Sequence, residues 1–309
     1  MLEVLSFGAG VQSTTLLFMS CDGVLPKLDA AIFADTQAEP QAVYAHLERC
    51  KAKAAKAGIE LIVATAGNLR DDLVEFWGKR KSADGKRHAS IPAFIKNPGE
   101  SVPAPLFGEN EVIVLDETRG IVRRQCTETY KIEVVERCVR KLLGLKKGQR
   151  WPVVPSVRLW LGISADEMDR MRVSSRPAVV HWYPLVEHLT VPANDLLGSR
   201  AMTRSDCLAW MESRGYERPP RSACTFCPFR SDAGWAQMKH ESPDDFADAC
   251  RVDRDIRQQD RSRTNRHGGI VGEPYIHSSL IPLDMVDFSA ETSKYLGGMR
   301  NECMGMCGN

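Results

Sequence analysis

The chain opens with a short apolar run, a loop that contains glycine, and a segment that can continue as a helix, and this order constrains the fold more than any other feature. Leu2 to Ser6 is the apolar run, Phe7 to Gln12 contains Gly8 and Gly10, and Ser13 to Met19 continues as a helix. The alternation goes on through a strand, a helix and a strand, which we expect at Asp29 to Ala34, Gln41 to Ala57 and Ile59 to Ala64. Strands that alternate with helices form parallel sheets, so we expect an open α/β fold with helices flanking a parallel sheet.

The pattern lapses from about residue 78 to residue 110, where Lys, Arg, Gly and Pro replace periodic apolar positions. We expect a long, partly mobile surface insertion there. Periodic signals then resume and predict a helix, a strand and a helix at Glu128 to Leu143, Val157 to Ile163 and Ala165 to about Val173, and Gly144 is expected to end the first of these helices. These elements complete a first domain, which we place at residues 1–190.

The remaining residues, 191–309, are expected to form a smaller, mostly helical region that is rich in cysteine and ends in a mobile tail. Thr203 to Arg214 has the pattern of a helix that ends at Gly215, and Ser231 to Arg263 is a polar helical region. No internal repeat is visible.

The charge balance excludes a whole-molecule attraction to polyanions. The 309 residues include 41 Lys and Arg against 40 Asp and Glu, a net charge of +1, so any basic surface must be local. The charge-free stretch Val4 to Cys21 contains polar residues and follows Glu3, unlike a signal peptide or a membrane span. We therefore expect a cytoplasmic protein without a membrane partner. In a reducing compartment, its ten cysteines indicate metal binding or catalysis rather than disulfides.

The loop from Ser6 to Ser13 lies between a strand and a helix, where backbone amides and the positive end of the helix can hold a phosphate. A Walker loop is excluded because the segment has no lysine. A dinucleotide fingerprint fits Gly8 and Gly10, with Asp35 as the acid, but Ser13 stands where a third glycine is needed. A glycine turn without a ligand is the remaining alternative.

This loop resembles the pyrophosphate loop of the ATP pyrophosphatase (PP-loop) superfamily, which reads close to Ser-Gly-Gly-x-Asp-Ser. Phe7, Gly8, Val11 and Gln12 are similar to its phosphoadenosine phosphosulfate (PAPS) reductase branch. The resemblance implies a fold like that of the adenine nucleotide alpha-hydrolases, with a nucleotide bound at this loop. The loop residues that it assigns to the nucleotide are Ser6, Phe7, Gly8, Gly10, Gln12 and Ser13.

Two further segments are similar to the same branch. Asp35 and Thr36 begin a segment that resembles Asp-Thr-Gly-x-x-x-x-Glu, and Gly162 begins one that resembles the later Gly-Ile-Arg turn. Each follows an expected strand, and the carboxyl ends of parallel strands form the ligand crevice of open α/β sheets. The resemblance therefore adds Asp35, Thr36 and Gly162 to the nucleotide site, although Asp35 could instead cap the helix that follows.

Cys224 and Cys227 form a Cys-x-x-Cys turn followed by proline, which can place two thiolates on one metal centre. Tetrahedral sulfur sites hold zinc or iron–sulfur clusters. Cys207 and Cys126 are candidates for further ligands. Arginines beside Cys126, among them Arg124, would lower the pKa of its thiol and offset the charge of a cluster. Reduced cysteines without a metal are the alternative.

The order Arg-x-Cys-Thr-x-x-Tyr-Lys, a further Cys, and then Ser-x-Cys-x-x-Cys-Pro-Phe resembles the PAPS reductase-like proteins that are common in phages and actinobacteria. Together with the loop motifs, this resemblance covers most of the chain. By similarity to iron–sulfur adenylylsulfate (APS) reductases, it implies a [4Fe-4S] cluster, with zinc as the alternative, and places Arg124 beside the bound cofactors. The implied ligands are Cys126, Cys207, Cys224 and Cys227.

The end of the chain, Glu302-Cys303-Met304-Gly305-Met306-Cys307, is similar to the Glu-Cys-Gly segment whose cysteine attacks the sulfonate in the reductases. The resemblance makes Cys303 and Cys307 candidate catalytic residues. The alternatives are that they supply a missing cluster ligand or have no role.

Three functions remain open at this point. The first is sulfur transfer coupled to ATP cleavage, with magnesium accompanying ATP, in which an acceptor is adenylated and then thiolated. The second is reduction of PAPS or APS with release of sulfite. The third is a nucleotide- and cluster-dependent nucleic-acid-binding protein without turnover. Its basis is a local basic run that could contact phosphates, with an ordinary solvated helix as the alternative: Arg119, Arg123, Arg124, Lys131, Arg137, Arg140, Lys141, Lys146 and Lys147.

The expected partners follow from these functions. They are an adenine nucleotide and a sulfur donor, either a cysteine desulfurase or a thioredoxin-like reductant. A nucleic-acid substrate and a second copy of the chain in a homodimer are further options.

Overall fold

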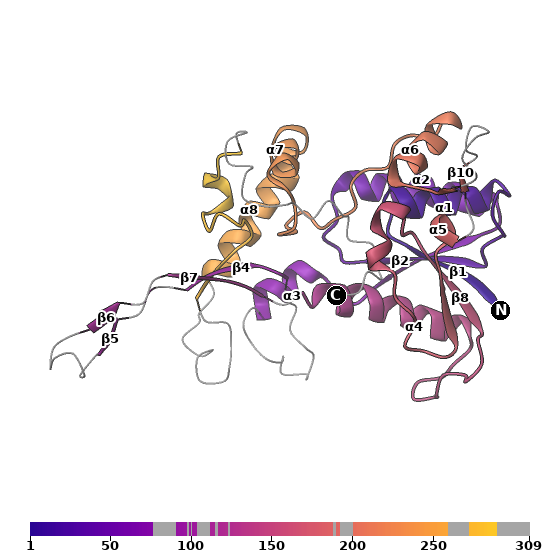
Figure 1. The fold of residues 1–309 in the computed structure, drawn as a ribbon, viewed down its shortest axis with the longest axis horizontal. Helices are drawn as coiled ribbons and strands as arrows, with labels where there is room; N and C mark the ends of the chain where they lie inside the picture. Colours follow the sequence, from indigo (N-terminus) through magenta and orange to yellow (C-terminus); the bar gives the residue numbers. More distant parts are fainter. Residues whose placement is uncertain are drawn as a thin grey trace. The chain divides into compact units, whose positions relative to one another are not determined.

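The computed structural model describes residues 1–76, 91–97, 99, 101–103, 112–114, 117–122, 124–187, 190–191, 200–258 and 272–288. These residues form two compact units (Figure 1). The sheet unit consists of Met1–Gly67 and Thr127–Cys224, and the second unit consists of Asn68–Cys126 and the described part of Thr225–Arg300. The domain bounds expected from the sequence, 1–190 and 191–309, stay a prediction.

The sheet unit contains a parallel sheet of five strands in the order β3-β2-β1-β8-β9. The strands are β1 (Leu2–Phe7), β2 (Ala30–Asp35), β3 (Glu60–Thr65), β8 (Val157–Leu161) and β9 (Val179–Trp182), and every neighbouring pair is parallel. The expected open α/β fold with a parallel sheet is therefore confirmed. Strand β9 was not predicted.

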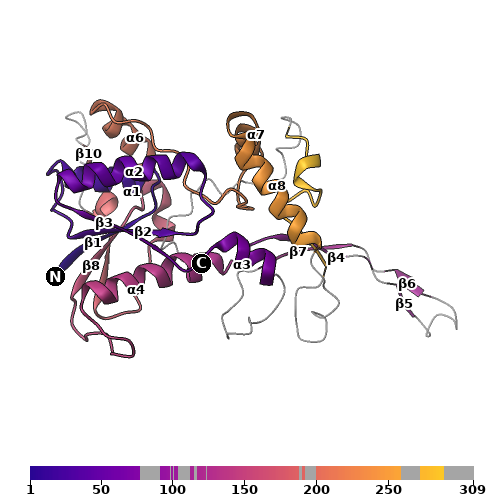
Figure 2. The same ribbon diagram turned by 180° about the vertical axis from the view of Figure 1, so that it is seen from behind.

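Helices cover both faces of this sheet (Figures 1 and 2). On one face lie α1 (Val11–Cys21) and α2 (Gln41–Lys56), together with α6 (Arg204–Ser213). On the other face lies α4 (Glu133–Leu142), which continues a π-helical turn, η1 (Glu128–Ile132). Gly144, with φ +68°, ends this helix as the sequence predicted, because glycine adopts left-handed backbone without steric cost.

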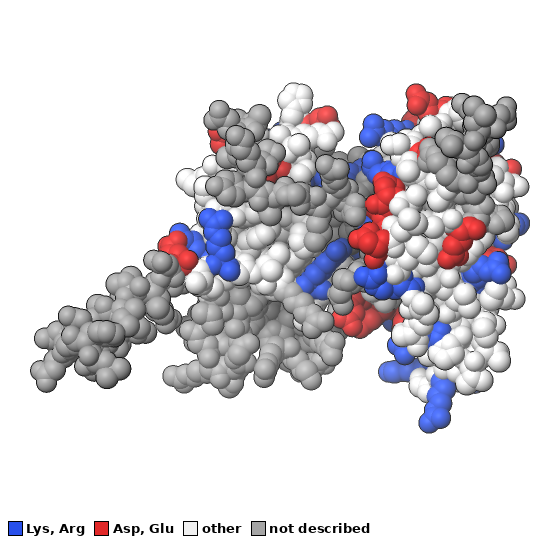
Figure 3. All heavy atoms as spheres, in the orientation of Figure 1, with Lys and Arg blue, Asp and Glu red and all other residues white. Residues whose placement is uncertain are grey.

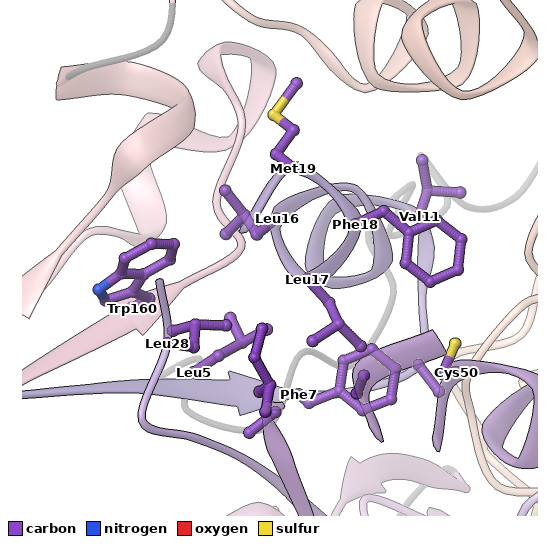
Figure 4. Packing of buried hydrophobic residues seen from close by; sticks show 14 of the residues in the cluster. Leu5, Phe7, Val11, Leu16, Leu17, Phe18, Met19, Leu28, Cys50 and Trp160 are labelled. Atoms are coloured by element: carbon purple, nitrogen blue, oxygen red, sulfur yellow. The ribbon is translucent and has the colours of Figure 1, made fainter. Parts of the chain in front are cut away.

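Alternate residues of each central strand serve the two faces. In β1, Leu5 and Phe7 pack with α1 and α2, whereas Val4 packs with α4. Figure 4 shows Leu16 and Leu17 of α1 lying over the sheet residues Leu5, Phe7 and Trp160. Burial on both faces explains why these strands read as continuous apolar runs rather than as an alternating pattern.

The connections of β1 create a switch point at the carboxyl edge of the sheet. Strand β1 lies between β2 and β8, and the chain leaves β1 into α1 on one face, whereas the helix that leads into β8 covers the other face. Open α/β sheets bind ligands in the crevice at such a point. The loops after β1, β2 and β8 all begin at this edge.

Shorter elements complete the sheet unit. The helix expected from Ala165 to Val173 is instead a 3-10 helix, η2 (Ala165–Arg170), and Glu167 interrupts it with φ −131°. The chain then forms β9, the helix α5 (Pro184–Glu187) and the antiparallel pair β10 (Thr190–Val191) and β11 (Arg200–Ala201). The expected helix Thr203–Arg214 is α6, and a capping box between Thr203 and Asp206 fixes its first turn.

The second unit is built on an antiparallel sheet in the order β12-β4-β7. Its strands are β4 (Phe94–Asn97), β7 (Thr118–Ile121) and β12 (Glu273–Tyr275), and a separate pair is formed by β5 (Ser101–Pro103) and β6 (Val112–Val114). Part of the expected surface insertion at 78–110 is therefore a strand with a buried side chain, since Ile95 is 5% exposed.

The helices of the second unit are α3 (Leu69–Phe76), α7 (Asp232–Glu241) and α8 (Pro243–Gln258), and a 3-10 turn, η3 (Leu283–Met285), follows β12. The single helical region expected from Ser231 to Arg263 is wrong in one respect, because it breaks at Ser242, whose φ of −141° is not helical. The residue after Ser242 is a proline, and a residue before proline is displaced from the helical region of backbone space. Residues 259–263 lie outside the described chain.

Asp253 of α8 organises the segment that follows β12. Its carboxylate accepts hydrogen bonds from the backbone amides of Ile276 (2.8 Å) and Leu283 (2.9 Å) and pairs with Arg257. We expect Asp253→Asn to lower the free energy of unfolding by about 2 kcal/mol, because a buried charge-assisted acceptor is lost. Urea unfolding measures this change. The exposed Asp284, which pairs with Arg254, is the control: Asp284→Asn should cost less than about 1 kcal/mol.

Candidate functional site

The loop between β1 and α1 is closed by the side chain of Ser13. The Ser13 hydroxyl accepts a hydrogen bond from the Gly8 amide (3.2 Å) and donates one to the Gly10 carbonyl (3.3 Å). Ala9, between the two glycines, has a left-handed backbone with φ +57°, which costs an L-residue about 1 kcal/mol or more. Gly10 caps α1 without a side chain, so the first amides of the helix face the loop as a helix N-terminus does at an anion site.

Gln12 links this loop to the loop that follows β8. Its side-chain nitrogen donates to the Ser164 hydroxyl at 3.3 Å, and both residues are buried. Gln12 Oε1 has no hydrogen-bond partner among the described residues. Gly162, one residue beyond the end of β8, lies on the same connection as Ser164. The structure thus joins two of the three expected nucleotide-binding segments across the switch point.

The end of β2 forms a tight turn held by Asp35. The Asp35 carboxylate accepts hydrogen bonds from the Gln37 amide (2.8 Å) and from the Tyr44 hydroxyl (2.9 Å). Burial and the nearby carboxylate raise the pKa of Tyr44, so the hydroxyl stays protonated and donates. Gln37 has φ +56°, which explains why glycine suits this position in the motif that the segment resembles. Asp35 therefore has a structural role at this edge.

Cys224 lies against the next residue of the same turn. Its sulfur is 3.4 Å from the hydroxyl of Thr36, which is buried at the end of β2. The first cysteine of the Cys-x-x-Cys turn therefore meets the sheet edge that also carries the glycine loop. No property of the sequence spacing alone indicates this contact, which joins residues 188 positions apart.

The other expected metal ligands have different surroundings. Cys126 and Cys227 belong to the second unit and are half-buried, as is Arg124, whose guanidinium lies 5.5 Å from the ring of Phe229. Their placement with Cys224 stays a prediction. Cys303 and Cys307 lie outside the described residues.

Cys207 is enclosed in the apolar core between α1 and α6 and is 0% exposed. Burial raises the pKa of its thiol to about 12, and a hydrogen bond with the side chain of Thr15 opposes this rise. Metal ligation by cysteine requires the thiolate, which this apolar setting disfavours. The surroundings are those of a structural thiol, and the ligand role of Cys207 stays a prediction.

A buried ion pair stands beside the glycine loop. Lys131 of η1 and Glu39 after β2 are 3.5 Å apart, with side chains that are 8% and 1% exposed. They line a cavity of about 10 Å³ together with Ser6 and Gly8, which has room for about one water molecule. Both residues occur in the motifs read from the sequence, but neither was assigned to the site. Only the packing of η1 against β2 brings them together.

A second buried network supports the loop from behind. His46 of α2 is hydrogen-bonded through Nε2 to the hydroxyl of Thr14, the residue after Ser13, at 3.0 Å, and Cys50 Sγ lies 3.3 Å from the same nitrogen. Burial lowers the pKa of His46 to about 4 and raises the pKa of Cys50 to about 12, so both are neutral at pH 7. The sequence gives no sign of this contact, because His46 occurs as an isolated histidine.

Two larger cavities of the sheet unit lie elsewhere. They measure about 180 and 520 Å³, and both are lined by residues 172–174, Arg176, Val179 and His181. Arg176 is paired with Glu136, and the walls are otherwise largely apolar. The smaller cavity beside Gly8 is lined by Ser6 and the pair of Lys131 and Glu39 together with apolar residues of β1 and β2.

Comparison with protein-family models, curated proteins and solved structures gave no match for this chain. Within the described part of the chain, no three His, Cys, Asp or Glu side chains are gathered in a way that could hold a metal ion. None of the helices described combines the length and the apolar composition needed to cross a membrane.

Proposed function

We propose that this chain is a PP-loop enzyme that binds an adenine nucleotide at the carboxyl edge of its parallel sheet and carries out ATP-dependent sulfur transfer. The observation that carries the proposal is the contact between Cys224 and Thr36. It brings a thiol of the Cys-x-x-Cys turn to the edge where Ser13 closes the glycine loop. A phosphate-binding loop beside a cysteine centre is the arrangement that thiolation of an activated acceptor requires.

In this reaction an oxygen of the acceptor attacks the α-phosphorus of ATP, and pyrophosphate leaves. The outer sulfur of a persulfide, delivered by a donor such as a cysteine desulfurase, then attacks the activated carbon, and AMP leaves with the oxygen. A second thiol cleaves the resulting S–S bond and releases the thiolated product, and a thioredoxin-like reductant reduces the disulfide that remains. The amides at the start of α1 would hold the phosphates, and Lys131 would supply positive charge beside Ser6. Gln12 would orient the loop through Ser164.

The chemistry of the donor set supports a soft metal centre. Cys126, Cys224 and Cys227 are half-buried, unlike the enclosed Cys207, and thiolates select zinc or iron–sulfur clusters. We propose that these three hold a [4Fe-4S] cluster, with zinc as the alternative, and that the fourth ligand comes from elsewhere. When bound, such a cluster would supply electrons or a sulfide to the reaction. Iron and sulfide analysis of anaerobically purified protein distinguishes the two metals.

The nucleotide site is tested by binding of ATP to the wild-type protein and to Ser13→Ala. We expect the substitution to raise the Kd for ATP by roughly tenfold, because the Gly8 amide loses its acceptor and the loop loses its closure. Ser20→Ala is the matched control. Ser20 lies at the far end of the same helix, where it bonds Pro26 and Leu28, and its loss should leave the Kd unchanged.

The products decide between the two enzymatic functions. Release of pyrophosphate and AMP in the presence of an acceptor supports sulfur transfer, whereas release of sulfite from PAPS would replace it with a reductase. If neither nucleotide binds, the proposed site is wrong.

A further inference from the structure

The segment from the second half of α4 through β8 carries a concentrated positive charge, far along the sequence from the glycine loop. Residues 137–165 contain seven Lys and Arg and no Asp or Glu. Three of the seven are used inside the sheet unit: Arg137 bonds the carbonyl of Thr65, Arg140 bonds two carbonyls of the turn, and Arg158 pairs with Glu3. The other four, Lys141, Lys146, Lys147 and Arg150, are exposed.

These four cations make no ion pair with any residue that the structure describes. One or two cations at a helix C-terminus would be explained by the helix dipole. Four cations within ten residues are more than the helix dipole accounts for. Figure 3 shows Lys and Arg side chains at the lower end of the sheet unit, where the turn after α4 lies in Figure 1.

The turn that presents these cations is held in one conformation by its own hydrogen bonds. The Arg140 guanidinium donates to the carbonyls of Lys146 (3.1 Å) and Gln149 (2.6 Å) and lies 5.2 Å from the ring of Trp151. The Gln149 side chain accepts from the Lys146 amide at 3.0 Å. Gly148, with φ +82°, allows the reversal. A fixed turn loses little conformational entropy when its side chains meet a partner.

We infer that this basic turn, defined as Lys141, Lys146, Lys147 and Arg150, binds the phosphate backbone of a nucleic acid. Lysines on a short turn without acidic neighbours contact phosphates as point charges and do not read bases. The turn lies at the amino edge of the sheet, opposite the glycine loop, because it leads directly into the start of β8. The inference adds a partner to the proposed function and does not depend on it.

The experiment measures binding of a fluorescent RNA hairpin and a DNA duplex of equal length, without ATP, across a range of salt concentrations. Four phosphate contacts predict a slope of about −3.6 for log K against log salt with the duplex. In the variant Lys146→Gln/Lys147→Gln/Arg150→Gln, we expect the slope to become shallower by about 3 and the affinity at low salt to fall by roughly tenfold or more.

Lys27→Gln/Lys56→Gln/Arg218→Gln is the matched control, since it removes three exposed cations from other parts of the sheet unit. Arg140→Lys is a second test. It keeps the net charge but loses the two carbonyl contacts that shape the turn, so it should weaken binding whereas the control should not. Equal slopes for the basic-turn variant and the control would overturn the inference. Binding to phosphatidylserine vesicles but to neither nucleic acid would also overturn it.

Because ATP is absent from this measurement, failure of the nucleotide site and failure of the basic turn give different results. If the protein binds RNA or DNA but not ATP, the inference about the basic turn holds and the proposed enzymatic function is wrong. If it binds ATP but neither nucleic acid, the proposed function holds and the inference about the basic turn is wrong.

Discussion

Lys131→Met is expected to lower the free energy of unfolding by about 4 kcal/mol, because removing one partner of a buried ion pair leaves the other charge uncompensated. The side chain of Glu39 is 1% exposed, and its Oε1 atom lies 3.5 Å from Lys131 Nζ. Chemical unfolding at pH 7 measures the change. The exposed pair Lys51 and Glu48 is the comparison, since Lys51→Met should cost less than about 1 kcal/mol.

The double variant Glu39→Gln/Lys131→Met tests the cause of this loss. If the cost arises from a stranded carboxylate, the double variant should be more stable than Lys131→Met alone, although both residues have been changed. A double variant that is less stable than the single one would show that Lys131 acts through packing instead. Because the pair lines the cavity beside Gly8, ATP binding to the double variant also shows whether Lys131 contributes to the nucleotide site.

His46 is expected to make the sheet unit sensitive to acid. Burial lowers the pKa of His46 from 6.5 to about 4 in the folded protein. As the pH falls below 6.5, the unfolded chain takes up a proton that the folded protein does not, so stability decreases with falling pH down to about pH 4. The loss attributable to this residue amounts to about 3 kcal/mol over that window.

The measurement is the difference in unfolding free energy between the wild-type protein and His46→Gln from pH 7 to pH 4. The free energies of unfolding of the two proteins should converge as the pH falls, since only the wild-type protein loses the contribution of His46. His240→Gln, at an exposed position, controls for removal of a histidine. Parallel curves for the wild-type protein and His46→Gln would contradict the assignment. Since His46 bonds Thr14 beside the glycine loop, nucleotide binding should weaken over the same range.

The parallel sheet could be predicted because its signals are local. Each central strand is an apolar run that a loop or helix signal bounds, and Gly144 marks the end of α4 in the sequence as it does in the structure. Strand β9 was missed because Val179–Trp182 is short and begins directly after a turn. Strand β4 was missed for a different reason. It pairs with residues 118–121 and 273–275, and such distant pairing leaves little trace in a short window.

The candidate site was predictable in part for the same reason. The glycine loop is contiguous, so its strand–loop–helix setting can be read directly, and Ser13 proves to close it. The pair of Glu39 and Lys131 depends on the packing of η1 beside the end of β2, which no spacing expresses. The burial of Cys207 could not be read from its position either, because a cysteine on a helix has the same pattern whether it faces a core or a metal.

The path of the chain through its two compact units has a practical consequence. The sheet unit is interrupted after residue 67 and resumes at residue 127, and the second unit is interrupted over the same stretch in which the sheet unit resumes. Neither unit can therefore be excised as one continuous fragment. A truncation at residue 126 would remove β8 and β9 from the sheet and α7 and α8 from the second unit, so a stop codon or a protease cut there would disable both halves at once.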